Sequence, residues 1–223
     1  MILIDAVISF AASFFMVLLS TSYFPPVSWL ALLYQHKEVA IDLWETYPKQ
    51  TYRNRCKITT SNGNMDLSIP VKKPNGNQSK TNEVLLDEKQ NWRQQHWRSI
   101  KNAYQSTPFF IHYEEGIKDI LESDITQLWK LNHALIKYIA KQIHMDYSIE
   151  YTDDFIEEST QQDYRFRIHP KQEEIIHLPP YYQVFDNRIG FQEGLSSLDL
   201  LFNLGPEAIL YLDKLPEITT NKQ

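Results

Sequence analysis

Two short segments concentrate arginine, histidine and aromatic side chains in a chain that is acidic overall. They cover residues 52–57 and 91–98 and together hold four arginines, one histidine and two tryptophans. A guanidinium group binds phosphate and carboxylate groups through paired N–H donors, and aromatic rings beside it suit the organic part of a ligand. The two segments therefore predict a binding site for an anionic molecule.

The first segment has the alternation of an extended strand. Arg53 and Arg55 are two residues apart, so their side chains project to the same side, and Lys57 continues the row. Three cations on one side repel each other unless a negative group joins them. That group is either a carboxylate of the protein or an anionic ligand, and the sequence leaves both open. The candidate ligand-binding residues here are Tyr52, Arg53, Asn54 and Arg55.

The second segment opens a predicted helix that runs from Trp92 to about residue 105. Asn91 is a favourable N-cap residue with Gln94 three positions later, which favours a capping box. Arg93 lies one turn before Trp97, close to the helix amino end that attracts anions. Asn91, Arg93 and Trp97 are therefore candidate binding residues.

His96 lies on the same helix, three residues after Arg93. A histidine beside a bound anion can act as a general acid or base, which makes His96 the candidate catalytic residue. The alternative is a histidine held in the core by a hydrogen bond. The sequence supports both interpretations equally.

The hydrophobic pattern predicts the elements that position these residues. A buried first strand at 16–21 leads into a helix with Pro25 and Pro26 in its first turn and with Trp29, Leu30, Leu33 and Tyr34 at helical spacing. With a second strand at 39–43, this order predicts a parallel βαβ unit. Residues 55–60 and 65–71, joined through Asn62 and Gly63, predict an antiparallel hairpin. Further helices are expected at 113–121, 126–143, 197–203 and 207–212, and further strands at 147–151 and 180–185. The expected fold is a single α/β domain over residues 16–223, with a mixed sheet and packed helices.

Composition excludes several classes of function. The net charge of -6 argues against a nucleic-acid partner, because such proteins usually carry a strongly basic surface. Cys56 is the only cysteine, so no intrachain disulfide or paired-thiolate zinc site can form, and the residue is expected to be buried rather than nucleophilic. The common metalloprotease, phosphate-loop, dinucleotide and serine-hydrolase motifs are missing, and no motif identifies a cofactor.

Residues 2–19 are almost all apolar but include Asp5, and no lysine or arginine precedes this run. A signal peptide or membrane anchor normally has a basic start and a longer uninterrupted apolar run. We therefore expect a functional start at Met16, with residues 1–15 as an upstream extension or a mispredicted start. We expect the protein in the cytoplasm and not in a membrane.

Two other polar groups stand out in the second half of the chain. Asp163, Arg165 and Arg167 alternate, so they either share one side of an extended segment or lie on a solvated loop. Asp199 and Asn203 are one turn apart on an otherwise apolar helix. They are expected to brace neighbouring backbone rather than face a pocket.

Several short motifs, taken in order, resemble the WbqC-like family of bacteria. The resemblance spans about residues 16–212 and is carried by Tyr23-Phe24-Pro25-Pro26, Tyr52-Arg53-Asn54-Arg55, Ser68-Ile69-Pro70-Val71, Asn91-Trp92-Arg93 with His96-Trp97, Tyr104, Pro108-Phe109-Phe110 and the stretch from Leu195 to Pro206. Members often occur in gene clusters for O-antigen and other surface polysaccharides. The resemblance implies glycine or other acyl transfer to a sugar.

The chain departs from the family pattern near its start. Many members carry His-Gln-Pro-x-Tyr-x-Pro, whereas residues 20–26 here read Ser-Thr-Ser-Tyr-Phe-Pro-Pro. The early histidine is therefore missing. A mechanism that uses it would have to rely on His96, or on Ser20 and Ser22.

The leading hypothesis is a transferase that modifies a nucleotide-linked amino sugar or another anionic small molecule. Arg53, Arg55 and Arg93 would hold the phosphates, and His96 would take the proton from the attacking amine. The sugar or base would lie against Tyr23 and Trp97. The alternatives are a non-catalytic binding or scaffold protein for an anionic glycan precursor or a partner enzyme, and a membrane-anchored assembly factor that depends on residues 1–15.

Overall fold

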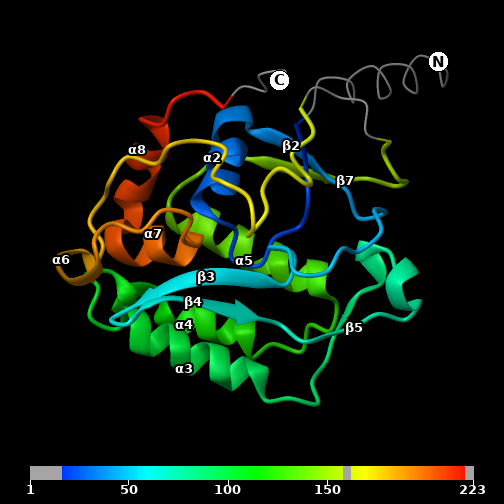
Figure 1. Cartoon of the computed structure of the whole chain (residues 1–223), viewed down its shortest axis with the longest axis horizontal. Coiled ribbons are helices and arrows are strands. Elements are labelled where there is room, and N and C mark those ends of the chain that lie inside the picture. The colour runs from blue at the N-terminus through cyan, green and yellow to red at the C-terminus, as the bar shows by residue number, and fades with distance from the viewer. Residues whose placement is uncertain (1–16, 158–161, 219–223) are drawn as a thin grey trace.

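The computed structural model describes residues 17–157 and 162–218, which form one mixed α/β domain (Figure 1). A parallel sheet has the order β1 (Val17–Leu19), β2 (Glu38–Ile41), β7 (Ser148–Tyr151). Helix α2 (Val27–His36) connects β1 to β2. The predicted βαβ unit is confirmed, and the apolar runs of β1 and β2 are buried, as is usual for parallel strands covered on both faces.

The predicted hairpin consists of β3 (Arg55–Thr60) and β4 (Gly63–Ser68), with Cys56 opposite Leu67. Residues 61 and 62 form its two-residue turn, one position earlier than the Asn-Gly pair suggests. Gly63 is the first residue of β4 and has a φ of +110°, which a residue with a Cβ rarely adopts. Cys56 and Ile58 face the core, while Arg55 and Lys57 lie on the half-exposed side.

A second antiparallel ribbon, β5 (Val71–Lys72) with β6 (Leu85–Leu86), follows the hairpin. Two 3-10 turns, η1 (Gly76–Gln78) and η2 (Thr81–Glu83), fill the connection between its strands. This polar connection stays on the surface apart from a few side chains such as Ser79 and Thr81.

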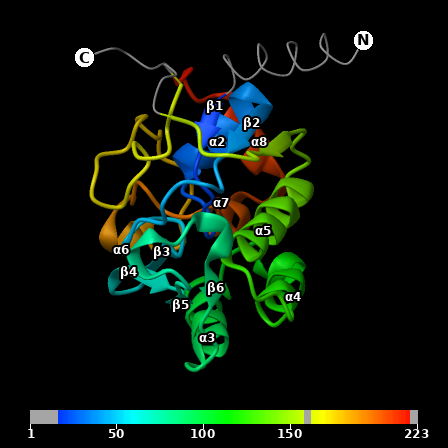
Figure 2. The same cartoon turned by 90° about the vertical axis from the view of Figure 1, so that its right-hand side faces the viewer.

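Helices cover the rest of the domain. Helices α3 (Trp92–Tyr104), α4 (Phe110–Leu121) and α5 (Leu128–Gln142) are consecutive, and α6 (Asp186–Ile189), α7 (Ser197–Leu204), η3 (Gly205–Glu207) and α8 (Ala208–Asp213) belong to the C-terminal part. The β3–β4 hairpin lies between α3 on one side and the parallel sheet with α2 on the other (Figures 1 and 2). One core therefore joins both halves of the chain.

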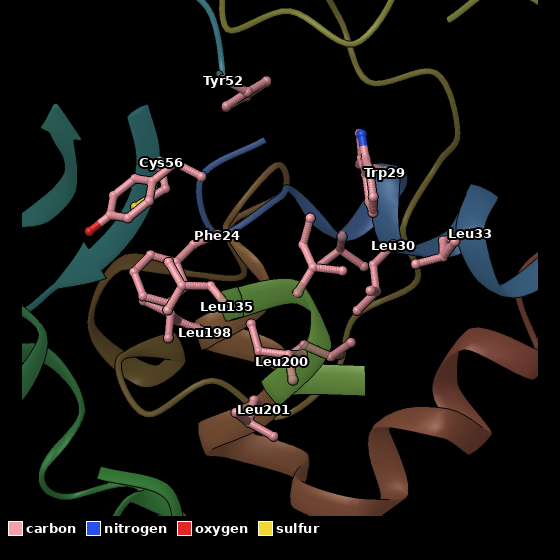
Figure 3. Packing of buried hydrophobic residues seen from close by; sticks show 14 of the residues in the cluster. Phe24, Trp29, Leu30, Leu33, Tyr52, Cys56, Leu135, Leu198, Leu200 and Leu201 are labelled. Atoms are coloured by element: carbon pink, nitrogen blue, oxygen red, sulfur yellow. The ribbon is translucent and has the colours of Figure 1, made fainter. Parts of the chain in front are cut away.

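Residues distant in sequence meet in this core (Figure 3). Phe24, Trp29, Leu135 and Leu198 are fully or almost fully buried and come from the β1–α2 turn, α2, α5 and α7. Trp29 also donates its indole N–H to the carbonyl of Ser20, at 3.0 Å. This bond fixes the chain directly after β1.

Backbone hydrogen bonds tie the start of α7 to the first half of the chain. The amide of Val27 donates to the carbonyl of Leu195 (3.1 Å), and the amide of Ser197 donates to the carbonyl of Pro25 (2.7 Å). The amide of Ser196 donates to the carbonyl of Lys57 in β3 (2.8 Å). The segment before α7 thus joins the β1–α2 turn to the hairpin.

Two local expectations are wrong, and a third concerns residues that the structure does not describe. Residues 180–185 do not form a strand, and the chain turns there into α6. Asn91 makes no side-chain capping hydrogen bond to the helix backbone, and its Nδ2 donates to Oε1 of Gln94 at 2.8 Å. The predicted extension at 1–15 lies outside the described residues. Within the described ranges, no helix combines the length and apolar character that a bilayer crossing requires.

Candidate functional site

Polar residues gather at the carboxyl ends of the three parallel strands, the edge where ligands bind in open α/β sheets. Asp42 directly follows β2 and is fully buried. Its Oδ1 accepts hydrogen bonds from the amides of Trp44 (2.8 Å) and Glu45 (3.1 Å) and from the hydroxyl of Thr152 after β7 (3.1 Å). The first strand contributes Thr21, which is also buried.

Arg165 reaches this edge from the C-terminal half. Its guanidinium forms ion pairs with Asp42 and, at 2.6 Å, with Asp163, and it donates to the carbonyl of Ile156 at 2.8 Å. The side chain is completely buried, so the interpretation of this segment as a solvated loop is wrong for Arg165. Burial of a charged group is costly unless it is paired, and Arg165 has two partners.

Arg53 forms a second buried pair next to the first. Its Nε and Nη2 each lie 2.6 Å from a carboxylate oxygen of Glu45, and Nη2 also donates to the carbonyl of Arg165 (3.3 Å). Burial raises the pKa of Glu45, although the charge and hydrogen bonds of Arg53 act in the opposite direction. The sequence left open whether a protein carboxylate or an anionic ligand neutralises the arginine row. For Arg53 it is a protein carboxylate, that of Glu45.

Asn132 of α5 connects this pair to the end of β1. Its Nδ2 donates to the hydroxyl of Thr21 (3.1 Å) and to the carbonyl of Arg53 (2.9 Å). The Oδ1 atom is buried and has no hydrogen-bond partner among the described residues. We call Asp42, Glu45, Arg53, Asn132 and Arg165 the strand-end cluster.

Two hydrogen-bond donors beside the strand-end cluster have no partner in the described part of the chain. They are Nε of Arg55 and the hydroxyl of Tyr47, and both atoms are buried. Burial raises the pKa of Tyr47, while the charges of Arg53 and Arg55 lower it. His169 also lies near these cations, since burial and then the charges of Lys171, Arg53 and Arg55 lower its pKa. Arg55 thus combines a positive charge with a buried donor that the described residues leave unused.

Two aromatic rings cover the guanidinium groups of the cluster. The ring of Phe166 lies 5.7 Å from the guanidinium carbon of Arg53 and 5.7 Å from that of Arg165, and Phe155 lies 5.5 Å from Arg165. Both residues are partly exposed, at 42% for Phe166 and 47% for Phe155. Partly exposed aromatic rings beside these guanidinium groups can stack on a base or sugar.

His96 lies in the core. Its Nδ1 is 2.9 Å from the hydroxyl of Tyr23, and its ring packs edge-on against Trp92 at 5.2 Å. His96 is 6% exposed and Tyr23 is fully buried. Burial lowers the pKa of His96 to about 4, although a hydrogen bond with the backbone of Ser68 raises it, so the ring is neutral at pH 7. This is the arrangement of a hydrogen-bonded core histidine, and its catalytic role stays a prediction.

Arg93 holds the amino end of α3 in place. It pairs with Glu88 at 2.7 Å, donates to the carbonyl of Ile125 at 2.8 Å and also donates to the carbonyl of Leu121. The guanidinium lies over the ring of Trp92 at 4.8 Å. Arg93 and Arg53 therefore have separate acidic partners, and the structure does not show the guanidinium groups of both segments meeting in one open pocket.

The remaining candidate residues have structural contacts as well. Trp97 stacks on Phe110 with ring centres 6.1 Å apart, and Asn91 is exposed. Asn54 donates to the carbonyl of Ile69 at 2.8 Å. Tyr52 is buried, and its carbonyl accepts a hydrogen bond from the amide of Tyr23 at 2.8 Å. The structure thus brings Tyr23, Tyr52 and His96 together. Arg55 differs from Arg53 and Arg93, because its buried Nε has no hydrogen-bond partner among the described residues.

Sequence reasoning missed Asp42, Glu45 and Tyr47. Asp42 could have been found, because it directly follows the apolar strand at 39–41 and such positions meet at one sheet edge. Glu45 and Tyr47 lie in an irregular segment, and their partner Arg53 is identified only by the folded structure.

Comparisons with known proteins identify a relative and a family. The chain is 26% identical to the uncharacterised protein Rv1507c of Mycobacterium tuberculosis, over 74% of this chain and 83% of the relative. No solved structure matches it significantly. The WbqC-like family model matches residues 21–175, a range that includes the strand-end cluster, Tyr47, Arg55 and His96. The chain belongs to the WbqC-like protein family.

Proposed function

We propose that the chain acts in the biosynthesis of a bacterial surface polysaccharide of the O-antigen type, and that it binds an anionic sugar precursor such as a nucleotide-linked amino sugar. Membership of the WbqC-like family supports the pathway. The observation that carries the binding site is the pair of buried, unpartnered donors, Nε of Arg55 and the hydroxyl of Tyr47.

A phosphate oxygen suits both of these donors. Leaving a buried donor without a partner costs about 1–3 kcal/mol, and a hydrogen bond from a guanidinium to an anion recovers that cost. Arg53 and Arg165 are already neutralised by Glu45, Asp42 and Asp163. In the proposal they hold the site in shape, and Arg55 supplies the cation that contacts the ligand.

The sugar or base extends toward the exposed rings of Phe155 and Phe166. Aromatic side chains stack on the flat face of a base and on the apolar face of a sugar. This assigns the stacking role to residues that the sequence did not single out. The roles predicted for Tyr23 and Trp97 stay predictions, since Tyr23 is buried and Trp97 packs against Phe110.

The finer proposal is acyl or aminoacyl transfer, with a glycine-like donor, to the amino group of the sugar. In this proposal the amine nitrogen of the sugar forms an amide bond to the acyl carbon, and the bond from that carbon to the donor's activating group breaks, so that this group leaves with the bonding electrons. The amine proton passes through the hydroxyl of Tyr23 to Nδ1 of His96, 2.9 Å away. A His96→Gln variant keeps a hydrogen-bonding side chain but removes the base. The proposal expects it to bind the precursor normally and to lose turnover by about 100-fold or more.

A non-catalytic binding or scaffold protein is the second candidate function. The observation that favours it is that the predicted chemical groups have structural partners: Arg53 pairs with Glu45, Arg93 pairs with Glu88, and His96 is buried against Tyr23. Mass spectrometry of sugars incubated with the protein and activated glycine separates the two functions. A modified sugar identifies a transferase, and binding without any product identifies a binding protein.

Isothermal titration with a panel of UDP-linked and dTDP-linked amino sugars tests the binding proposal. We expect Arg55→Ala to weaken binding by about 10- to 100-fold, since a charge-assisted hydrogen bond contributes roughly 1.5–3 kcal/mol. Lys57→Ala is the matched control on the same strand, because Lys57 lies near Glu174 and binding should change by less than about twofold. Equal effects of both substitutions, or no binding by the parent protein at about 1 mM ligand, would refute the proposal.

The cytoplasm is the proposed location. Nucleotide-linked sugars are made there, and the one cysteine of the chain, Cys56, is a buried free thiol. A reducing compartment suits such a protein.

A further inference from the structure

A cleft opens on the C-terminal part of the domain, outside the range that the family model matches. It lies between residues 179–182 and the helices α7 and α8, and has a volume of about 350 Å³. Its lining includes Tyr181, Tyr182, Tyr211, Leu210, Glu207 and Lys214. We call it the tyrosine cleft, and none of the residues of the strand-end cluster belongs to it.

Two of the tyrosine rings are held in fixed positions. The hydroxyl of Tyr181 donates to Oδ2 of Asp199 at 2.7 Å, and its ring packs edge-on against Tyr211 at 4.9 Å and Phe191 at 5.3 Å. Tyr211 donates its own hydroxyl to the carbonyl of Pro179 at 2.8 Å. Neither ring needs to be ordered when a ligand binds, which lowers the entropic cost of binding.

Asp199 lies behind Tyr181 and is completely buried. Its Oδ1 has no partner that meets normal hydrogen-bond geometry among the described residues. A buried carboxyl group is costly, and here it orients a ring of the cleft wall. Asp199 thus braces a side chain of a cavity, which differs from the backbone bracing that the sequence predicts, although Asn203 does donate to the backbone carbonyl of Asp199 at 2.8 Å.

The chemistry of the lining selects a class of ligand. Tyr182 and Leu210 are 56% and 57% exposed, so an apolar surface faces the solvent beside one carboxylate, Glu207, and one ammonium group, Lys214. A sugar ring has an apolar C–H face that stacks on aromatic side chains and hydroxyl edges that bond to charged groups. A phosphate prefers several cations together, which this cleft does not provide.

The volume of the cleft limits the size of the ligand that it can hold. A volume of about 350 Å³ is at the lower end of the usual range for ligand pockets, which is about 300–1,000 Å³. It can enclose one sugar ring but not a complete nucleotide sugar. From this geometry we propose that the tyrosine cleft is a carbohydrate subsite that holds a single hexose or N-acetylhexosamine ring.

Within the proposed function, on which this assignment of role rests, the ring is the terminal sugar of a glycan and the precursor binds separately beside Arg55. The binding itself requires only the cleft. Tyr182 and Leu210 supply the exposed apolar surface, and Asp199 is a positioning residue that acts through Tyr181.

Saturation-transfer NMR with the methyl glycosides of N-acetylglucosamine, N-acetylgalactosamine and glucose tests the proposal. We expect transfer to the ring C–H protons of at least one glycoside, and an affinity reduced about tenfold in Tyr182→Ala, where a stacking ring is lost. Leu210→Ala should weaken binding less. Ile111→Ala is the matched control, because Ile111 is an exposed aliphatic residue (75%) on α4, away from the cleft lining.

Tyr181→Phe tests the positioning role of Asp199, since it keeps the ring and removes the hydroxyl. We expect weaker glycoside binding with unchanged circular dichroism. Saturation transfer to none of the glycosides, or equal binding by the parent and Tyr182→Ala proteins, would overturn the proposal. UDP binding measured on the same samples tests the Arg55 site separately, so a failure of the cleft is distinguishable from a failure of the proposed function.

Discussion

The buried carboxyl group of Asp199 should make the stability of this protein depend on pH in an unusual direction. Burial raises the pKa of Asp199 from 3.8 to about 6, although the hydrogen bond from Tyr181 opposes the increase. Between these two pKa values the folded protein keeps a proton that the unfolded chain releases. The free energy of unfolding therefore falls as the pH rises from about 4 to about 6.

The magnitude follows from the two pKa values. The difference between 3.8 and about 6 corresponds to about 3 kcal/mol, at 1.36 kcal/mol for each pKa unit. An asparagine in place of the acid would be neutral at every pH and could still accept the hydrogen bond of Tyr181. We expect Asp199→Asn to gain about 3 kcal/mol relative to the parent protein between pH 4 and pH 6–7.

Urea unfolding at pH 4, 5, 6 and 7, followed by circular dichroism, measures this difference. Asp146→Asn serves as the control, because Asp146 is an exposed aspartate and its substitution should give a small difference in stability. A difference between Asp199→Asn and the parent that stays constant across this range would refute the reasoning. It would show that the carboxyl group does not keep its proton in the folded state.

Three further substitutions have expected effects on urea unfolding. Glu45→Gln leaves the buried guanidinium of Arg53 without its anion and should cost about 3–5 kcal/mol, whereas the double variant Glu45→Leu, Arg53→Met should lose less; a double variant as unstable as the single one would contradict this. Gly205→Ala should cost about 1–3 kcal/mol, because Gly205 has a φ of +55° and a Cβ there would lie 2.4 Å from the ring of Phe109; unchanged stability would be evidence against it. Arg93→Ala should cost about 1–3 kcal/mol through the loss of its bonds to two backbone carbonyls, and a neutral result would show that they contribute nothing.

The sequence predicted the elements whose signals are local. The run from Val17 to Leu19, the prolines before α2 and the apolar segment at 39–41 are sufficient for the βαβ unit, and the alternation around Ile58 with a nearby Asn-Gly pair is sufficient for the hairpin. The pairing of β7 with β2 involves residues more than 100 positions apart, and no local signal contains it.

The segment at 180–185 shows why a strong local preference can mislead. Its tyrosines, valine and phenylalanine favour a strand. In the structure Gln183 donates to the carbonyl of Gln192 (2.9 Å) and accepts the amide of Gln192 (2.9 Å), so a side chain replaces the backbone partner that a strand would use. Pro179 precedes the segment and Pro180 is its first residue, and neither proline has an amide N–H to donate to a neighbouring strand. Side-chain pairing of this kind cannot be inferred from residue preferences.

The candidate site shows the same limit. The sequence identified Arg53, Arg55, Arg93 and His96 as residues that could do chemistry, but not what each would contact. Arg53 meets an acid eight positions earlier, while Arg165 meets one more than 100 positions away. A charged residue that binds a ligand and one that closes an internal ion pair look alike until the chain is folded.

The hydrogen bonds between residues 195–197 and the β1–α2 turn and β3 have a consequence for folding during synthesis. Until residues 195–197 have been translated, the amide of Val27 and the carbonyls of Pro25 and Lys57 lack their hydrogen-bond partners. The nascent chain therefore completes its core only after α7 has emerged from the exit tunnel. A premature stop before Leu195 would leave a long, apolar and unfinished polypeptide for chaperones and proteases to handle.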